Sequence, residues 1–201
     1  MQSLLTEAII LPALLHESDW VLKNLAQRHF SDINEMVCCF FDVLSRLDQL
    51  EKRLQKRDQP SYWPCGDATQ PVESSASDDT RLILWYPNVT MANALTHLWA
   101  FRIVCLTEIK RFTMHDPFRD QEQPIRTGKL GLDFDDLQAQ MIALAKKISL
   151  SMVYLLQDEM KLFGPASTFF PLRIANQTFK ATEQGQQVDI AYLEDIVDQL
   201  D

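Results

Sequence analysis

Apolar residues recur at helical spacing over most of the chain. The strongest pattern predicts a helix over residues 31–57, because its apolar positions repeat every three or four residues. These positions are Ile33, Met36, Val37, Phe40, Phe41, Leu44, Leu47 and Leu54. Ser31 is placed to cap the start of this helix. Upstream, residues 4–30 carry two shorter apolar sets on either side of Pro12, which predicts two short helices because proline lacks a backbone N–H.

Two further long helices are predicted, over residues 89–112 and 133–163. Asn88 is expected to cap the first of them, since its side-chain oxygen can accept a hydrogen bond from the first turn. Gly164 and Pro165 are expected to end the second, because glycine favours a left-handed cap and proline cannot continue a helix.

The C-terminal part of the chain is predicted to hold two more helices. Ser167 or Thr168 is expected to cap one of them, and Asp189 the other. The last helix is amphipathic, with its apolar positions at Ile190, Leu193, Ile196, Val197 and Leu200. We therefore divide the chain into a helical domain, residues 1–183, and a linker with this amphipathic helix, residues 184–201.

Two polar stretches interrupt the helical pattern. Residues 58–79 and 115–131 are rich in proline, glycine and polar side chains, which predicts loops because so little apolar surface cannot offset the entropy lost on ordering. The short apolar run 82–86 fits either a strand or a helix. Together these patterns predict an all-α fold, a single irregular helical domain of about seven helices with two polar loops.

Length and composition narrow the class of protein. The 201 residues are 46% hydrophobic, which suits one domain with its own core. Lys and Arg number 19 against 28 Asp and Glu, and the net charge of −9 argues against a nucleic-acid-binding surface. No apolar run approaches the roughly 18 residues of a membrane span, and the apolar N-terminal stretch lacks the features of a signal peptide. We therefore expect no membrane insertion, no secretion, and a nuclear or cytoplasmic location.

Residues that commonly hold metals or perform catalysis form no known pattern in this sequence. The cysteines match no zinc-binding spacing, and the histidines lie far apart along the chain. These residues are Cys38, Cys39, Cys65, Cys105, His16, His29, His97 and His115. The acidic residues at 133–136 and 158–159 are better explained as a helix start and a solvated face than as opposed magnesium-binding clusters. We expect no catalytic residue, no metal, no cofactor, and hence no enzyme.

Two stretches of the sequence are similar to motifs of a known family. Residues 86–100, YPNVTMANALTHLWA, have an alanine–asparagine helix leading to an aromatic–tryptophan pair. Residues 149–173, SLSMVYLLQDEMKLFGPASTFFPLR, carry the more specific likeness. Both resemble the C-terminal part of the fungal-specific transcription-factor domain, which is found in fungal binuclear zinc-cluster regulators. The likeness extends from near the start of the chain to about Thr182.

This resemblance implies an all-helical regulatory region that, in the family, lies downstream of a DNA-binding zinc cluster. The zinc cluster needs six closely spaced cysteines beside basic residues, and this chain has neither. Direct binding to nucleic acid is therefore not carried over. The resemblance instead implies a transcription regulator that acts through a protein partner, such as a full-length zinc-cluster regulator, or through a small-molecule effector. The regulated genes in the family are often those of secondary metabolism.

The candidate ligand or partner contacts are aromatic side chains and one helix turn. They are Trp85, Tyr86, His97, Trp99 and Tyr154, together with the turn at Gly164–Pro165. Aromatic residues at helical spacing also fill cores, so both interpretations stay open. The alternative function is a helical small-molecule-binding protein or enzyme of a fungal biosynthetic pathway, with a pocket lined by His97, Tyr154 or acidic residues. A further alternative is a fragment of a longer regulator.

Overall fold

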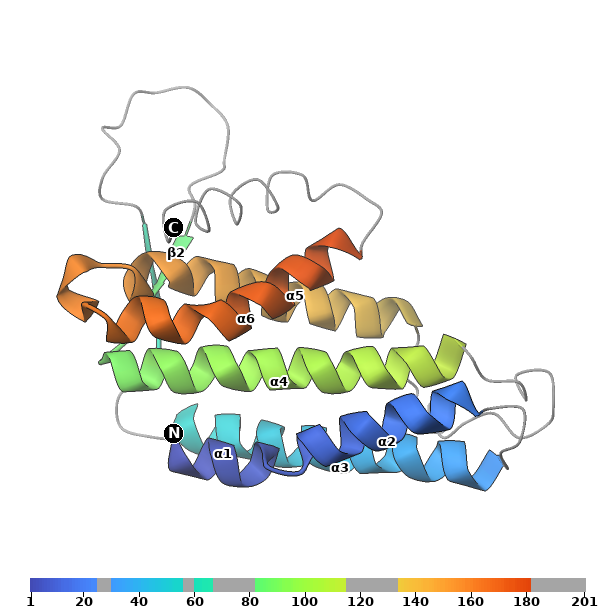
Figure 1. The fold of residues 1–201 in the computed structure, drawn as a ribbon. Coiled ribbons are helices and arrows are strands. Elements are labelled where there is room, and N and C mark those ends of the chain that lie inside the picture. The colour runs from blue at the N-terminus through green and yellow to red at the C-terminus, as the bar shows by residue number, and fades with distance from the viewer. Residues whose placement is uncertain (25–29, 56–59, 67–81, 115–133, 182–201) are drawn as a thin grey trace.

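Six α-helices and one short 3-10 helix form nearly all of the chain that the computed structural model describes, namely residues 1–24, 30–55, 60–66, 82–114 and 134–181 (Figure 1). In chain order the elements are α1 (Gln2–Ala8), α2 (Leu11–Lys23), α3 (Phe30–Gln55), β1 (Trp63–Gly66), β2 (Leu82–Trp85), α4 (Val89–Met114), α5 (Phe134–Leu155), η2 (Asp158–Met160) and α6 (Phe163–Lys180). The predicted all-α class is confirmed.

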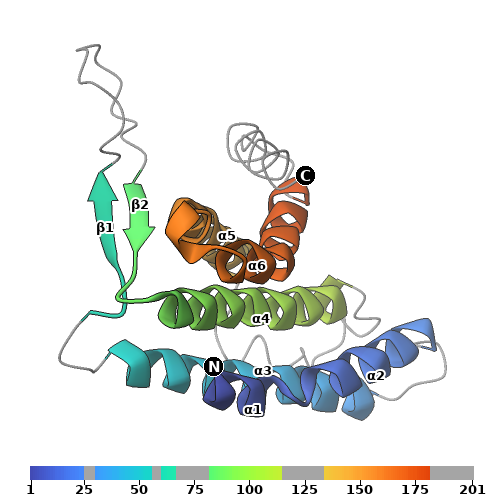
Figure 2. The ribbon, with the colours of Figure 1, turned by 60° about the vertical axis from the view of Figure 1, so that its left-hand side comes forward.

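Helix α4 lies between two layers of helices. Helices α1, α2 and α3 cover one side of it, and α5 and α6 cover the other (Figures 1 and 2). A helix covered on both sides must be apolar around most of its circumference. Its buried apolar residues are Ala92, Ala94, Leu95, Leu98, Trp99, Ala100, Ile103, Cys105, Leu106, Ile109 and Phe112.

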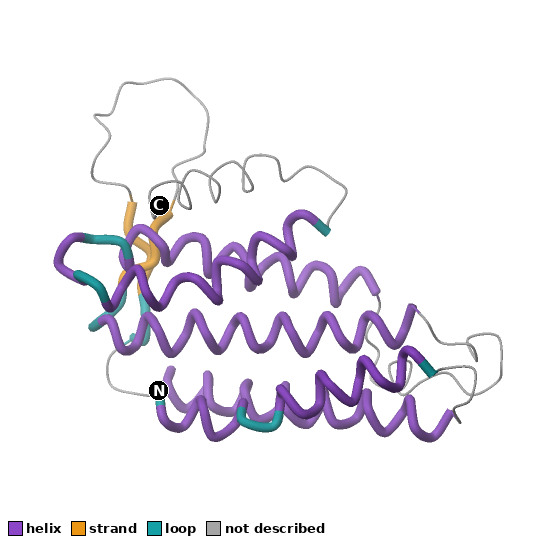
Figure 3. The backbone as a smooth tube through the Cα atoms, in the orientation of Figure 1, coloured by secondary structure: helices purple, strands orange, loops and turns teal. Residues whose placement is uncertain are grey.

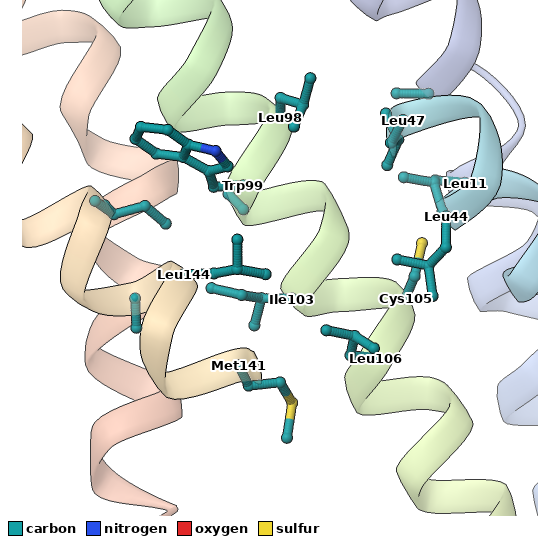
Figure 4. Close-up of a cluster of buried hydrophobic side chains, with 14 of the residues drawn as sticks. Leu11, Leu44, Leu47, Leu98, Trp99, Ile103, Cys105, Leu106, Met141 and Leu144 are labelled. Atoms are coloured by element: carbon teal, nitrogen blue, oxygen red, sulfur yellow. The ribbon is translucent and has the colours of Figure 1, made fainter. Parts of the chain in front are cut away.

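The side chains of α4 divide between these two layers. Ile103 lies with Met141 and Leu144 of α5, while Cys105 lies with Leu11 and Leu44 on the opposite side (Figure 4). Burial, with a smaller effect of Glu108, raises the pKa of the Cys105 thiol to about 12. Cys105 is therefore a neutral, small apolar side chain of the core at physiological pH.

Within the part of the chain that the structure describes, α4 is long and apolar enough to cross a membrane by length and composition alone. However, 56% of its most apolar stretch is buried inside the protein. The central helix of a packed domain has the same composition, so this observation is weak evidence for a span. The expectation of no membrane insertion stays a prediction.

Two of the predicted helix starts agree with the structure and one does not. Pro12 lies in the first turn of α2 and separates it from α1, as expected. The Asn88 side-chain oxygen accepts a hydrogen bond from the backbone N–H of Met91 at 2.9 Å, so Asn88 caps α4. The prediction that Ser31 caps α3 is wrong, because this helix begins one residue earlier, at Phe30.

The predicted boundary between the last two described helices is also wrong. Helix α5 ends at Leu155 instead of Phe163, and Gly164 and Pro165 lie in the first turn of α6. The chain turns at Lys161, which follows η2; its φ is 49°, but its ψ of −134° lies outside the left-handed helical conformation expected of a glycine cap. Proline is tolerated in a first turn because its missing N–H would have no partner within the helix there.

The helix caps predicted just after this boundary are wrong for the same reason. Ser167 and Thr168 lie inside α6 and do not precede it. Their hydroxyls donate to the backbone oxygens of Gly164 and Pro165, each at 2.7 Å. Ser167 Oγ also lies 2.6 Å from Asn93 Oδ1 of α4, so this residue links two helices instead of starting one.

A two-stranded antiparallel ribbon occupies part of the stretch predicted as the first polar loop (Figure 3). Strand β1 pairs with β2, with Trp63 opposite Trp85, so the ambiguous run 82–86 contains a strand. Pro64 is compatible with β1 because a two-stranded ribbon consists only of edge strands. Strand β2 packs against α5, which fixes the ribbon to the helices.

Several predictions fall on residues that the structure does not describe. These are the second polar loop, 115–131, most of the first, and the amphipathic helix after Asp189. The division into residues 1–183 and 184–201 falls there too, since the described chain ends at Ala181.

Candidate functional site

Four of the five predicted aromatic contacts meet in one group. The ring centroids of Trp85 and Tyr154 are 5.6 Å apart, and those of Tyr86 and Tyr154 are 5.2 Å apart. Tyr62, which the sequence analysis missed, lies 6.2 Å from Tyr86 and 5.6 Å from Trp99. We call these five residues the aromatic cluster. It joins the ribbon to α4 and α5.

Most of the aromatic cluster lies in the protein interior. Tyr86, Trp99 and Tyr154 are buried, and Tyr62 and Trp85 are half-buried. Burial raises the pKa of Tyr86 far above its ordinary value and raises that of Tyr154 as well. Both phenols are therefore neutral at physiological pH and unsuited to act as bases.

A hydrogen-bond chain accounts for the buried hydroxyl of Tyr86. This hydroxyl and Ser151 Oγ are 2.5 Å apart, and Ser151 donates to the backbone oxygen of Lys147 at 2.6 Å. With its own proton so used, Ser151 accepts the proton of Tyr86. This hydrogen-bond chain fixes the residue after β2 to the last turns of α5, which is a structural role.

Trp99 is held by a polar network between α3 and α4. Its Nε1 donates to Glu51 Oε1 at 2.9 Å, and Arg102 donates to the other oxygen of this carboxylate. Arg102 also pairs with Asp48 at 2.9 Å. Lys147 Nζ lies 5.3 Å from the centroid of the Trp99 ring, within range of a cation–π interaction. The sequence could have indicated that Glu51 is buried, because it follows Leu47 by four residues and so lies on the apolar side of α3.

A second network ties α2 to α4. The buried Ser18 hydroxyl donates to Glu108 Oε2, and Arg111 binds Glu108 Oε1 at 2.7 Å and Asp19 at 3.0 Å. Burial lowers the pKa of Arg111, but its hydrogen bonds to Glu108 and Asp19 outweigh this effect and raise it overall. Both oxygens of Glu108 are thus directed toward Ser18 and Arg111.

His97 is separate from the aromatic cluster. His97 precedes Trp99 by two residues on α4, which places the two side chains about 200° apart around the helix. The centroid of its ring lies 6.5 Å from that of Phe101 and 5.9 Å from that of Phe170 of α6. Its Nδ1 is 2.8 Å from the backbone oxygen of Asn93. Burial lowers the pKa of His97 although the hydrogen bond to Asn93 opposes this shift. A neutral ring that donates through Nδ1 fits these contacts.

Replacing His97 with glutamine is expected to make the free energy of unfolding fall less steeply as the pH becomes acidic. The unfolded chain takes up a proton at His97 near pH 6.5, whereas the folded chain resists it until a lower pH. The wild type therefore loses stability as the pH falls below about 6.5. Between about pH 7.5 and about pH 5.5, His97→Gln should lose up to about 1 kcal/mol less than the wild type in urea titrations. An identical loss in both proteins would contradict this prediction.

Large apolar side chains are exposed around the start of α6, near the Gly164–Pro165 turn that the sequence analysis singled out. Leu162 and Phe163 are each 78% exposed, Phe169 is 62% exposed and Phe170 is 37% exposed. Phe163 and Phe170 are seven residues apart and lie on the same face of the helix. We call these four residues the α6 apolar surface. Exposed apolar groups of this size commonly mark interaction sites.

A pocket of about 270 Å³ opens among α4, α5 and α6. It is lined by Ile103, Val104, Thr107, Glu108, Lys110, Gln138, Met141, Ile174, Gln177, Thr178 and Ala181. It includes neither His97 nor Tyr154, and the acidic residue in its lining is Glu108. We call it the α4–α5–α6 pocket.

The comparisons leave the family undecided. No family model matches the sequence, and no curated protein or solved structure is significantly similar to it. Over the described ranges, no three His, Cys, Asp or Glu side chains gather closely enough to hold a metal ion. The resemblance to the fungal-specific transcription-factor domain therefore stays a prediction.

Proposed function

We propose that the chain is a transcription-regulatory protein that resembles the regulatory region of fungal zinc-cluster factors. These 201 residues do not contain the six closely spaced cysteines of a zinc cluster, and the chain acts by binding a protein partner, a full-length zinc-cluster regulator, in the nucleus or cytoplasm. Genes of a secondary-metabolite cluster are the proposed targets. The observation that carries this proposal is the α6 apolar surface, which lies within the motif of residues 149–173.

The geometry of α6 suits a helix that docks into an apolar groove. Such helices present anchors at positions i, i+3 or i+4, and i+7. Phe163, Ala166 and Phe170 occupy positions i, i+3 and i+7, and all three are exposed. Phe169 and Leu162 widen the apolar area beside this line.

The overall charge favours a basic partner. The chain carries a net charge of −9, and opposite charge accelerates association and selects among partners. The zinc-cluster region of a full-length regulator is basic, which makes such a protein a suitable partner by charge as well as by the resemblance.

The test is binding of the full chain to full-length zinc-cluster regulators from the same organism, produced one at a time and measured by biolayer interferometry. The double variant Phe163→Ser, Phe169→Ser should weaken binding at least about tenfold, because exposed aromatic anchors carry much of such binding energy. Ile9→Ser is the matched control, since Ile9 is 79% exposed and far along the chain from α6. An equal loss of affinity in the double variant and in Ile9→Ser, or no binding by the wild type, would refute the proposal.

The second candidate is a helical small-molecule-binding protein or an enzyme of a fungal biosynthetic pathway. The α4–α5–α6 pocket favours binding of a small molecule, since its size and partly apolar lining are typical of ligand sites. Ligand binding in this pocket without partner binding at the α6 apolar surface would favour the second candidate over the first.

A further inference from the structure

We infer that the α4–α5–α6 pocket binds a small uncharged molecule that is mostly hydrocarbon, and that it discriminates against ions of either sign. The inference rests on the second candidate function, in which this pocket holds a small molecule, and it adds the chemical class of that molecule. The pocket shares no residue with the α6 apolar surface. Binding of a protein partner at that surface therefore succeeds or fails in a different experiment.

The size of the pocket limits the ligand. A cavity of roughly 150 Å³ in a protein core accommodates benzene. The 270 Å³ of this pocket scales to about ten non-hydrogen atoms. A single ring with a short substituent fits this volume, whereas a long alkyl chain is too large.

The inner walls of the pocket are apolar and come from all three helices. Ile103 of α4 and Met141 of α5 are both buried, and they lie close together between these helices in Figure 4. Val104 and Ile174, which are half-buried, extend this wall on α4 and α6. Apolar walls from three elements favour a compact hydrocarbon body, and the thioether of Met141 favours an aromatic ring.

The two charged residues of the lining already have partners within the protein. Glu108 accepts hydrogen bonds from Ser18 and Arg111, one on each carboxylate oxygen. Lys110 Nζ donates to Gln138 Oε1, and both of these residues make further interactions. Because one charged residue is acidic and the other is basic, their formal charges cancel. The lining therefore attracts neither an anion nor a cation.

The hydroxyl groups of the lining are also engaged. Thr107 Oγ1 donates to the backbone oxygen of Ile103 at 2.8 Å, and Thr178 Oγ1 donates to that of Ile174 at 2.8 Å. Each hydroxyl has a single proton, which these bonds use. The remaining polar residue of the lining, Gln177, is exposed to water. Binding energy in this pocket must therefore come mainly from the burial of apolar surface.

An ion that entered the pocket would lose water without gaining a counter-charge. Burial lowers the pKa of Lys110, so a positive charge is less well stabilised there than in water. Moving an unpaired charge into such surroundings is unfavourable, whereas an uncharged ligand of the same shape has no such cost. The pocket thus favours the uncharged molecule.

The first experiment compares three probes of nearly equal shape on the full chain, namely uncharged cumene, the anion benzoate and the cation benzamidinium. The chemical shift of the isotope-labelled Met141 methyl group reports binding in this pocket, because Met141 lines it. We expect cumene to bind with a dissociation constant on the order of 100 µM, as its size allows. Both ions should bind at least about tenfold more weakly.

Each outcome of this comparison has a distinct meaning. Equal or tighter binding of either ion would overturn the ligand class and leave the pocket as a small-molecule site. No saturable shift of the Met141 methyl group with any probe would overturn the inference as a whole. Neither result bears on the α6 apolar surface, which the interferometry experiment tests.

Variants of the lining residues place the site. Val104→Trp should abolish binding of cumene by filling the pocket, and Val153→Trp is the matched control, since Val153 is 38% exposed on α5 outside the lining. Lys110→Met should leave the affinity for cumene within about threefold, because an uncharged hydrocarbon makes no charge-assisted contact with the ammonium group. Undiminished binding in Val104→Trp, or a loss of about tenfold in Lys110→Met, would overturn the inference. The three-probe comparison on the wild type decides if either variant fails to fold.

Discussion

Gly164→Ala is expected to lower the free energy of unfolding by about 3 kcal/mol, the upper part of the range for overpacking. A Cβ atom at this position would overlap the backbone oxygen of Leu155 and approach Met160 Cβ to 2.7 Å. The oxygen belongs to the last residue of α5, so it can move aside only if the ends of α5 and α6 separate. Urea denaturation followed by far-UV circular dichroism measures the loss.

The matched control for this substitution is Ala166→Gly, two residues further along α6. Ala166 is exposed, so its replacement should cost only about 1 kcal/mol, the difference in helix propensity between alanine and glycine. A cost of Gly164→Ala below that of Ala166→Gly would contradict the close approach of the two helices.

Glu51→Leu is expected to lower the free energy of unfolding by about 3–5 kcal/mol, as found when one partner of a buried ion pair is removed. The Trp99 N–H would lose its acceptor, and Arg102 would lose the less exposed of its two carboxylate partners. Asp48→Asn is the control, since the Asp48 side chain is 43% exposed and exposed pairs contribute at most about 1 kcal/mol.

The double variant Glu51→Leu, Arg102→Met separates two explanations of that loss. If the loss comes from an uncompensated charge, removing Arg102 as well should restore much of it, because apolar side chains can replace a buried pair. Losses that simply add would mean that each side chain contributes through its own packing, and would contradict coupling through the ion pair. Thermal denaturation of all four proteins completes the cycle.

The helices could be predicted from the sequence because their apolar residues recur at one period over many turns. The start of α4 was predictable for a local reason, since Asn88 and the N–H of Met91 are three residues apart. The boundary at Gly164 was not predictable in this way. Glycine there is needed for the approach of α5 to α6, a contact between elements, and not for a left-handed helix cap; the residue with positive φ at this boundary is Lys161.

The ribbon and the polar networks depend on partners that are distant in the sequence. Strand β1 has four residues, two of them Pro64 and Gly66, and only its pairing with β2 makes it a strand. Tyr62 joins the aromatic cluster through Trp99, which lies on another element. The sequence therefore singled out aromatic residues that do lie close together, but their burial depends on tertiary packing and could not be predicted.

The position of α4 between two helical layers has a consequence for folding. Among the described residues, helices α1–α3 and α5–α6 bury their apolar sides mainly against α4 or within their own layer, so α4 is the main link between the two layers. Neither layer can dissociate without exposing one side of α4 to water. Cooperativity of unfolding therefore resides in α4, and a cut between β2 and α4 would leave the N-terminal helices with an open hydrophobic face.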